Sequence, residues 1–412
     1  MSGIFSLLKT KCAGQRDLRL PITHFGQNLF QTGLVMKSQI LKKCFSYIRK
    51  EVVLSVSVLL AVASCFFVAP DKEYLSYIDW NTLALLFSLM AVIKGLQEAD
   101  FFVCMAGNML EKIKTTRTML FLLVFMPFVF SMVVTNDVSL ITFVPFGIAI
   151  LKMAQMERLI VPQVVLQTVA ANLGSMLTPM GNPQNLYLYN QSGIGFGRFC
   201  LIMLPYVAAS ALFLAAAILF IKNSDFSGVP FTSGIKNRKS LLFYACGFVL
   251  CLLAVFKVLP SVLVAVIVAI SLLVLDRKIL KKVDYALLGT FFAFFIFVGN
   301  FARIEPVRNF LFSVLNGRVE IVSVITSQII SNVPAALLLS GFTSQWQSLI
   351  IGCNFGGLGT LIASMASLIS YKIVIREYPG MKKRYFFFFT FLNVLFLILL
   401  FLVYILFQHV SL

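Results

Sequence analysis

Long apolar runs alternate with short polar segments along the chain. Three of the runs have about 20 residues, the length that a helix needs to cross a bilayer, and they begin at Val52, Phe199 and Tyr385. Alternating ten-residue segments, which would indicate a transmembrane β-barrel, do not occur in the sequence. The pattern therefore predicts an all-α polytopic membrane protein.

One apolar segment is interrupted by the polar triplet TND at positions 135–137. The apolar arms beside it have about 15 residues each, which is short for a full crossing at ~1.5 Å per residue. Basic residues flank both ends of the segment, Arg117 before it and Lys152 after it. Because cytosolic segments carry an excess of Lys and Arg, this favours a re-entrant hairpin that enters from the cytosol. Two ordinary spans joined by a short loop are the alternative.

A second interruption reads GSMLTPMGNPQN, at positions 174–185. Glycine and proline disfavour helix, yet hydropathy places this stretch within the membrane. Non-helical backbone is tolerated there only where protein or a water-filled cavity satisfies its polar groups. We therefore expect a broken helix over 172–185.

The second half of the chain repeats both interruptions. Positions 353–368 (CNFGGLGTLIASMASL) align without gaps to 171–186 (ANLGSMLTPMGNPQNL), at an offset of 354 − 172 = 182, and SNV at 331–333 takes the place of TND. Asp79 follows an acidic segment, whereas Asp284 follows the basic segment DRKILKK. The charge rule therefore predicts that the two repeats have inverted topology.

These features divide the chain into four predicted parts. Residues 1–50 form a basic cytosolic N-terminal tail, 51–222 the first transmembrane half, 223–239 a cytosolic linker and 240–412 the second transmembrane half. The hairpin tips lie at 135–137 and 331–333, and the broken helices at 172–185 and 354–367. The protein is thus predicted to be a multi-pass protein of the cell membrane, inner or plasma, with a cytosolic N-terminus.

Composition narrows the class of function. Hydrophobic residues make up 59% of the chain, charged residues 12%, and the net charge is +18. The basic residues lie in the tail and between the spans, which is typical of topology signals and lipid contact rather than of nucleic-acid binding. The eight cysteines form no CxxC pair, and His24 and His409 lie outside the spans. We therefore expect no metal centre of the His/Cys type and no enzymatic activity.

The interruptions supply the candidate site. Helix N-termini at such breaks suit an anion, whereas helix C-termini and unwound carbonyl groups suit Na⁺. The candidate substrate- and ion-binding residues are neutral, with Asp137 as the exception, and we expect no cofactor other than Na⁺, at the Asn136/Gly181 and Asn332/Gly357 breaks. They are Thr135, Asn136, Asp137, Asn172, Gly174, Thr178, Gly181, Asn182 and Asn185 in the first half, and Ser331, Asn332, Val333, Asn354, Gly356, Gly357, Thr360, Ser364 and Ser367 in the second.

These motifs resemble those of a known superfamily. TNDVSLITFVPF, ANLGSMLTPMGNPQN, SNVPAALLLS and GCNFGGLGTLIASMASLIS are similar to the paired signatures of the ion transporter superfamily, which includes arsenite permeases, citrate transporters and divalent-anion/Na⁺ symporters. In the symporters the tips read Ser-Asn-Thr and bind Na⁺ and carboxylate, and the resemblance implies that role for Asn136 and Asn332. Asp137 and Val333 stand where those tips have Thr. TND is closer to the arsenite-permease and Na⁺/H⁺-antiporter branches.

The prediction is a secondary active transporter that moves a small anion, either a dicarboxylate or citrate-like anion or an inorganic oxyanion, coupled to Na⁺ or H⁺. The alternative within this class is a Na⁺/H⁺ antiporter or an arsenite-type efflux permease. A channel and an intramembrane enzyme are disfavoured, the enzyme because the spans lack paired catalytic groups. Predicted partners are the small anionic substrate and the lipid bilayer, not nucleic acid. Analogy with the superfamily adds a homodimer, and a partner ATPase stays open as an energy source.

Asp137 is the one carboxylate that the sequence places deep in the membrane. An ionised side chain at the centre of a spanning helix costs about 2.5–3.5 kcal/mol on insertion scales, so its presence calls for a partner or a function. Asp137 could cap the outgoing arm of the hairpin. It could also take up H⁺ or Na⁺ and couple transport to an ion gradient. The sequence leaves both roles open.

Overall fold

The computed structural model describes residues 51–110, 113–225 and 237–410. The N-terminal tail at 1–50 and most of the 223–239 linker therefore lie outside the described residues. Within the described ranges the regular elements are helices, apart from an isolated bridge between Thr115 and Asp225, so the all-α prediction is confirmed. The chain divides into two units at Ser55, and the description below concerns Val56–Leu412.

The helices of the first half are interrupted where the sequence predicts. They are α2 (Val52–Cys65), η1 (Lys72–Leu75), α3 (Trp80–Glu98), α4 (Phe101–Leu110), α5 (Thr116–Phe130), α6 (Asn136–Met153), η2 (Glu157–Leu159), α7 (Ile160–Gly174), η3 (Pro179–Gly181), α8 (Pro183–Ser192) and α9 (Phe196–Leu219). The hairpin arms α5 and α6 thus flank the 135–137 tip, and α7 and α8 flank the predicted break.

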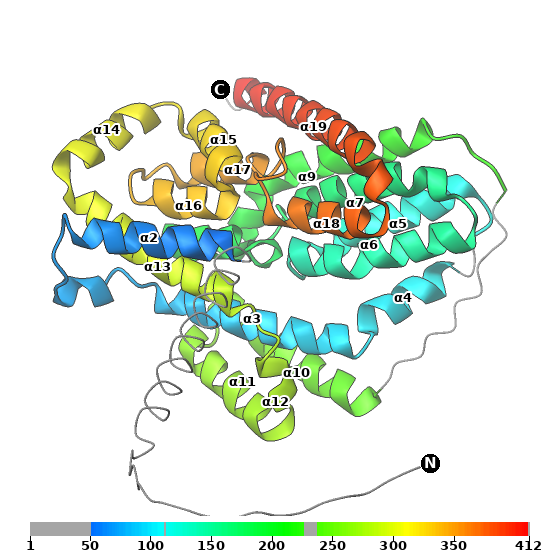
Figure 1. The fold of residues 1–412 in the computed structure, drawn as a ribbon. Helices are drawn as coiled ribbons and strands as arrows, with labels where there is room; N and C mark the ends of the chain where they lie inside the picture. The colour runs from blue at the N-terminus through cyan, green and yellow to red at the C-terminus, as the bar shows by residue number, and fades with distance from the viewer. Residues whose placement is uncertain (1–50, 111–112, 226–236, 411–412) are drawn as a thin grey trace, which may run out of the picture. The chain divides into compact units, whose positions relative to one another are not determined.

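The helices of the second half repeat this series in order from the fourth of them onward. They are α10 (Arg238–Val255), α11 (Ser261–Leu275), α12 (Arg277–Leu280), α13 (Tyr285–Arg303), α14 (Glu305–Leu315), α15 (Val319–Ile330), α16 (Asn332–Ser340), α17 (Trp346–Phe355), α18 (Met365–Glu377), η4 (Pro379–Met381) and α19 (Lys382–Val410). From α13 to α19 each helix corresponds in order to one from α3 to α9 (Figure 1).

Six helices in the described part of the chain are long and apolar enough to cross a membrane, which confirms a multi-pass membrane protein. They span Lys72–Glu98, Asn136–Met153, Phe196–Leu219, Arg238–Val255, Tyr285–Arg303 and Pro379–Phe407. Large apolar side chains remain exposed on them, such as Phe387 (69%) and Leu402 (52%) on α19. Lipid accommodates such side chains at no cost. The helix α6 is longer than the sequence suggested, so the choice between a re-entrant hairpin and two spans stays a prediction.

The corresponding helices α3 and α13 have the same kind of N-terminal cap. The Asp79 carboxylate accepts a hydrogen bond from the Thr82 amide at 3.0 Å and caps α3, and the Asp284 carboxylate accepts one from the Leu287 amide at 2.9 Å and caps α13. An aspartate at this position satisfies amides that the first turn leaves unpaired. The inverted orientation of the two halves stays a prediction.

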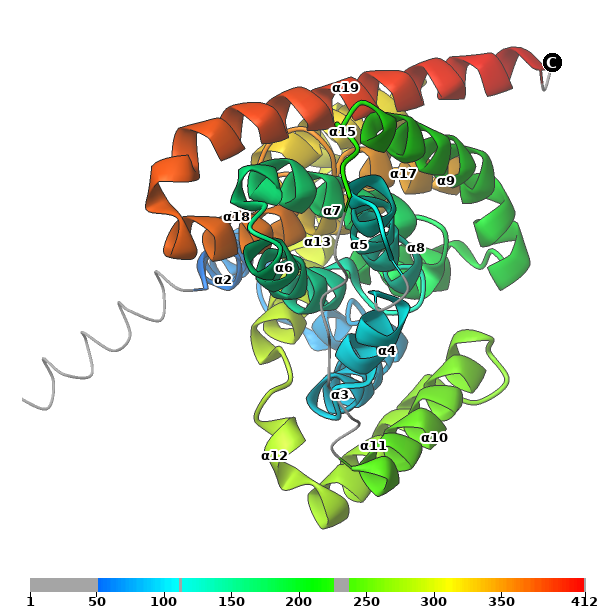
Figure 2. The same cartoon turned by 90° about the vertical axis from the view of Figure 1, so that its right-hand side faces the viewer.

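The helices pack in three groups. α5, α6 and α7 contact one another together with α18; α15, α16 and α17 contact one another together with α8; and α10 and α11 pack on α3. Each hairpin thus packs with the first part of its own broken helix and the second part of the other one. Figure 1 shows the first two groups side by side, and Figures 1 and 2 both show α3, α10 and α11 beneath them. This exchange of α8 and α18 brings the two breaks together.

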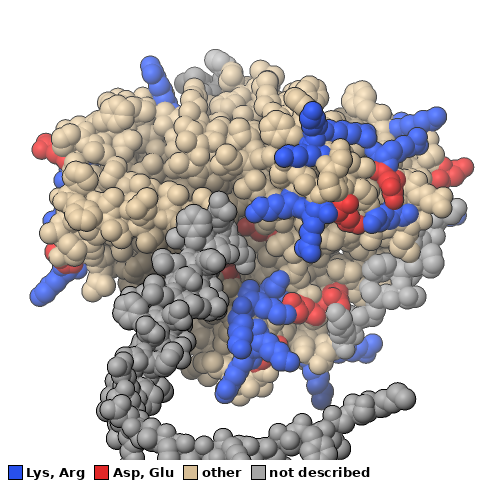
Figure 3. All heavy atoms as spheres, in the orientation of Figure 1, with Lys and Arg blue, Asp and Glu red and all other residues tan. Residues whose placement is uncertain are grey.

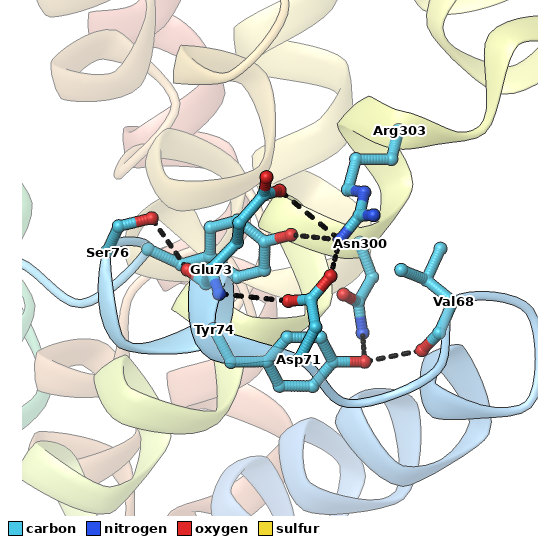
Figure 4. Close-up of polar contacts among 8 residues, drawn as sticks. Val68, Asp71, Glu73, Tyr74, Ser76, Asn300 and Arg303 are labelled. Atoms are coloured by element: carbon cyan, nitrogen blue, oxygen red, sulfur yellow. Dashed lines mark hydrogen bonds and ion pairs between the residues drawn. The ribbon is translucent and has the colours of Figure 1, made fainter.

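A polar cluster ties the end of α13 to the segment between α2 and α3 (Figure 4). The Arg303 guanidinium contacts the carboxylates of Asp71 at 2.7 Å and Glu73 at 3.4 Å, and the buried Asn300 amide donates to the Tyr74 hydroxyl at 2.9 Å. The hydrogen bond from Arg303 holds the pKa of Asp71 below its usual value. The positive charge of Arg303 at the end of α13 is therefore offset by acidic partners.

Charged side chains cluster rather than spread over the surface. Figure 3 shows most of the Lys and Arg side chains of one face on its right-hand and lower parts, further charged side chains along the left-hand edge, and broad uncharged areas between the two. This distribution is typical of a protein whose charged ends contact water and headgroups while its flanks contact lipid.

Candidate substrate and ion site

The first break follows from its glycines and prolines. α7 ends at Gly174, where an added Cβ would lie 1.9 Å from the Phe128 carbonyl oxygen and 2.7 Å from the Ser131 hydroxyl. Only glycine allows this approach of α7 to the hairpin. Pro183 then begins α8 after Asn182, a position where its missing amide proton has no cost.

The second break is built in the same way. An added Cβ at Gly356 would lie 2.4 Å from the Ser327 hydroxyl. Gly356 corresponds to Gly174 (356 − 174 = 182), and Ser327 corresponds to Ser131 at the offset that relates the tip asparagines (327 − 131 = 332 − 136 = 196). The same glycine–serine contact therefore joins hairpin and broken helix in both halves.

The hairpin tips differ in shape. In the first tip, five residues separate α5 from α6, and the Asn136 side chain donates to the side-chain oxygen of Asn172 at 3.0 Å. In the second, Ser331 alone separates α15 from α16, with φ at 74°, a conformation that is strained for serine. The amide of Asn332 donates to the Ala363 carbonyl in the second break at 2.9 Å. The first tip thus contacts α7, and the second tip contacts the segment between α17 and α18.

The two halves exchange reciprocal hydrogen bonds. The Asn172 side chain donates to the Ser367 hydroxyl at 3.2 Å, and the Asn354 side chain donates to the side-chain oxygen of Asn185 at 2.8 Å. Asn354 is the counterpart of Asn172, and Ser367 is the counterpart of Asn185 (367 − 185 = 182). Contacts of this i-to-j and j-to-i kind are those that a two-fold axis between the halves produces.

Further bonds connect most of the predicted residues. The Ser364 hydroxyl donates to Asn172 at 3.1 Å, and the Asn182 side chain donates to the Ser175 hydroxyl at 2.7 Å. The Thr178 hydroxyl donates to the Met132 carbonyl beside the first tip. The asparagines and serines of this network, Asn136, Asn172, Asn182, Asn185, Ser331, Asn332, Asn354, Ser364 and Ser367, are all at most 5% exposed.

Four predicted residues lie at the edge of this network or contribute backbone alone. Gly357 lies against the Asn332 amide, 2.9 Å from where its Cβ would be, whereas Gly181 lies against the carbonyl oxygens of Ser175 and Ser131. Thr360 is exposed, and Val333, in the first turn of α16, has no polar side-chain atom. The Asn332/Gly357 pair is therefore in contact.

Gln328 is a site residue that the sequence analysis missed. Its side chain donates to the carbonyls of Gly356 at 3.2 Å and Leu358 at 2.9 Å and accepts from the Thr360 amide at 2.8 Å. It therefore satisfies the unwound backbone of the second break. The available signal was a glutamine within an apolar hairpin arm, where an unpartnered amide is costly.

Asp137 does not cap α6, so that expectation is wrong. Thr135 occupies the N-cap position, and the amide of Asp137 receives its hydrogen bond from the Asn136 side chain, at 2.9 Å. Asp137 lies in the first turn of α6, half-buried, where the helix dipole favours a negative charge. Among the described residues no hydrogen bond or ion pair to its carboxylate is recorded, which leaves the carboxylate available to a ligand.

Comparison with known proteins agrees with this geometry. The model of the citrate transporter family (CitMHS) matches residues 40–345. The chain belongs to the citrate transporter family. An uncharacterized transporter of Methanocaldococcus jannaschii is 32% identical over 78% of this chain and 87% of its own length, and the inner membrane protein YbiR of Escherichia coli is 30% identical over 77% and 86%. The putative transporter arsB of Dictyostelium discoideum is 28% identical over 32% of this chain and 23% of its own length.

Membership of the citrate transporter family establishes the coarse function. The chain is a multi-pass membrane transporter of the citrate/arsenite permease type within the ion transporter superfamily, as the motifs predicted. Its matched relatives are named as transporters or membrane proteins rather than as enzymes.

Proposed function

We propose that this protein is a secondary active transporter of a small anion, coupled to Na⁺ or H⁺. The observation that carries the proposal is the meeting of both interrupted halves in one buried network, through Asn172 with Ser367 and Asn185 with Asn354. The relative named as an inner membrane protein supports a location in the cell membrane. The basic tail supports a cytosolic N-terminus.

The helix ends at this network favour an anion together with a cation. Four helices begin at the interruptions, at Asn136, Pro183, Asn332 and Met365, and their N-termini carry the partial positive charge of the helix dipole. Four others end there, α5, α7, α15 and α17, and their terminal carbonyl groups suit Na⁺. The buried side-chain oxygen of Asn354 has no partner among the described residues and is a further acceptor.

Neutral side chains suit a carrier because the ligand must also leave. Asparagine amides donate to a carboxylate or oxyanion without the strong binding of a buried lysine or arginine. We propose that the hairpins and broken helices move together relative to α3, α10, α11 and α13, which carries the site across the membrane. The driving force then comes from an ion gradient.

Uptake into proteoliposomes tests the proposal. Citrate, C4-dicarboxylates, sulfate and arsenite are offered with an imposed Na⁺ gradient, a pH gradient or neither. We expect saturable uptake of at least one anion that requires one of the gradients. Uptake that never saturates would indicate a channel, and gradient-independent uptake would contradict secondary active transport.

A Na⁺/H⁺ antiporter or arsenite-type efflux permease is the second candidate, because the Asp137 carboxylate beside the first tip makes no hydrogen bond or ion pair with the described residues. The partial likeness to a protein named arsB supports the same branch. The uptake assay separates the two proposals. Proton release on Na⁺ addition without any anion would favour the antiporter.

A further inference from the structure

An apolar cleft lies between α4, α10 and the turn that leads to the first hairpin tip. It has a volume of about 920 Å³, and its lining comprises Leu96, Phe101, Phe102, Met105, Val129, Phe130, Val133, Val134, Arg238, Leu241, Leu242, Ala245, Phe248 and Val249. Several of these side chains are well exposed, including Leu242 (67%), Val249 (55%) and Val133 (42%). A soluble protein would rarely leave such a surface open.

Among the described residues that line the cleft one is charged, and it lies at one end. Arg238 is the first residue of α10 and lies at the end of the predicted cytosolic linker, and the wall continues along α10 as far as Val249. These 11 steps span about 16 Å at ~1.5 Å per residue. That length matches one leaflet, half of a hydrocarbon core of about 30 Å. A cation at headgroup depth above an apolar wall one leaflet long fits a phospholipid.

We propose that this cleft binds a phospholipid with an anionic headgroup, its phosphate at Arg238 and an acyl chain along α10. Charge complementarity selects the headgroup, because an anionic lipid is attracted to Arg238 more strongly than a zwitterionic one. The acyl chain of this lipid also contacts Val133 and Val134, which lie directly before Thr135. The lipid therefore supports the turn that positions the Asn136 tip. This inference goes beyond the proposed function, and its test needs no transport activity.

Quenching of tryptophan fluorescence by brominated lipids tests the proposal. Trp80 and Trp346 are replaced by Phe, and a single tryptophan is introduced as Leu242→Trp in the cleft. The matched control is Leu219→Trp at the end of α9, because Leu219 is similarly exposed (63%) and lies within one helical turn of the basic residue Lys222, as Leu242 lies about one turn from Arg238. Bilayers contain brominated phosphatidylglycerol or brominated phosphatidylcholine.

At Leu242→Trp we expect quenching that reports an affinity about fivefold higher for phosphatidylglycerol, which corresponds to the ~1 kcal/mol of one basic residue near an anionic lipid. The control should show no such preference. Arg238→Gln should abolish the preference and Arg238→Lys should retain it, with emission from Leu219→Trp confirming that each variant is folded. Equal quenching by the two lipids at the cleft, the same preference at the control, or a preference that survives Arg238→Gln would overturn the proposal.

Discussion

Asn136 and Asn332 occupy equivalent places in the two hairpins, yet they are held differently. Asn136 bonds to Asn172 through its side chain, whereas Asn332 is tied to Ala363 through its backbone amide. The Asn332 side chain lies beside Gly357. The two halves therefore contribute the same types of residue to the candidate site, but the corresponding residues make different contacts.

Replacing either tip asparagine by Ala is expected to abolish transport, because each removes an amide that no neighbour can replace. Uptake in proteoliposomes is the measurement, and membrane expression with a monodisperse elution profile is the control for folding. Asn309→Ala is the matched variant outside the buried network, since Asn309 is exposed on α14, and it should retain most activity. Full activity of Asn136→Ala or Asn332→Ala would remove that residue from the site.

Asp137→Asn is expected to separate binding from coupling. The substitution keeps the size of the side chain, but it removes the ability to bind a proton and weakens any Na⁺ ligation. Anion binding should persist while the dependence of uptake on pH or Na⁺ disappears. If the variant keeps the gradient dependence of the wild type, the neutral oxygens of the two breaks hold the driving ion.

At the scale of elements, the breaks depend on close contact between the broken helices and the hairpin arms. Gly174 and Gly356 let α7 and α17 approach Ser131 and Ser327, and α8 and α18 pass to the opposite hairpin. A Cβ in either place would push the helix away from the hairpin. The geometry of the site is therefore sensitive to side chains that contact no ligand.

Gly174→Ala is expected to lower stability by at least about 1–3 kcal/mol, the usual cost of overpacking, because the Phe128 backbone cannot move aside as a side chain could. Thermal unfolding of the purified protein measures the effect. Gly197→Ala is the control, since an added Cβ there meets nothing within 4 Å. An unchanged melting temperature for Gly174→Ala would contradict the packing described here.

The interruptions could be predicted because polar residues such as asparagine are scarce in this apolar chain, and two copies of one polar pattern at an offset of 182 are a specific signal. The amphipathic helices α4 and α14 could not be predicted in this way, because their 10 and 11 residues are too few to cross a membrane. The partners across the halves, Asn172 with Ser367 and Asn185 with Asn354, depend on the exchange of α8 and α18 between the hairpins. No local pattern records that exchange, just as none records the role of Gln328.

For the whole molecule, the reciprocal contacts support two related halves, and their inverted orientation is a separate prediction. Ser76 precedes α3 and Lys281 precedes α13, and both are exposed. In a cysteine-free background, an impermeant maleimide added to intact cells should label Ser76→Cys but not Lys281→Cys. Labelling should reverse in inside-out vesicles. Labelling of both positions from the same side would contradict the inversion.

The most direct test is a calorimetric measurement of the affinity for the transported anion. It compares variants that carry a substitution in opposite halves. Asn172→Ala and Asn354→Ala each remove one of the reciprocal bonds between the breaks. If both halves build one site, each should weaken binding at least about tenfold, equivalent to ~1.4 kcal/mol, while the protein remains folded. Wild-type affinity in either variant would show that a single half holds the anion and would contradict a shared site.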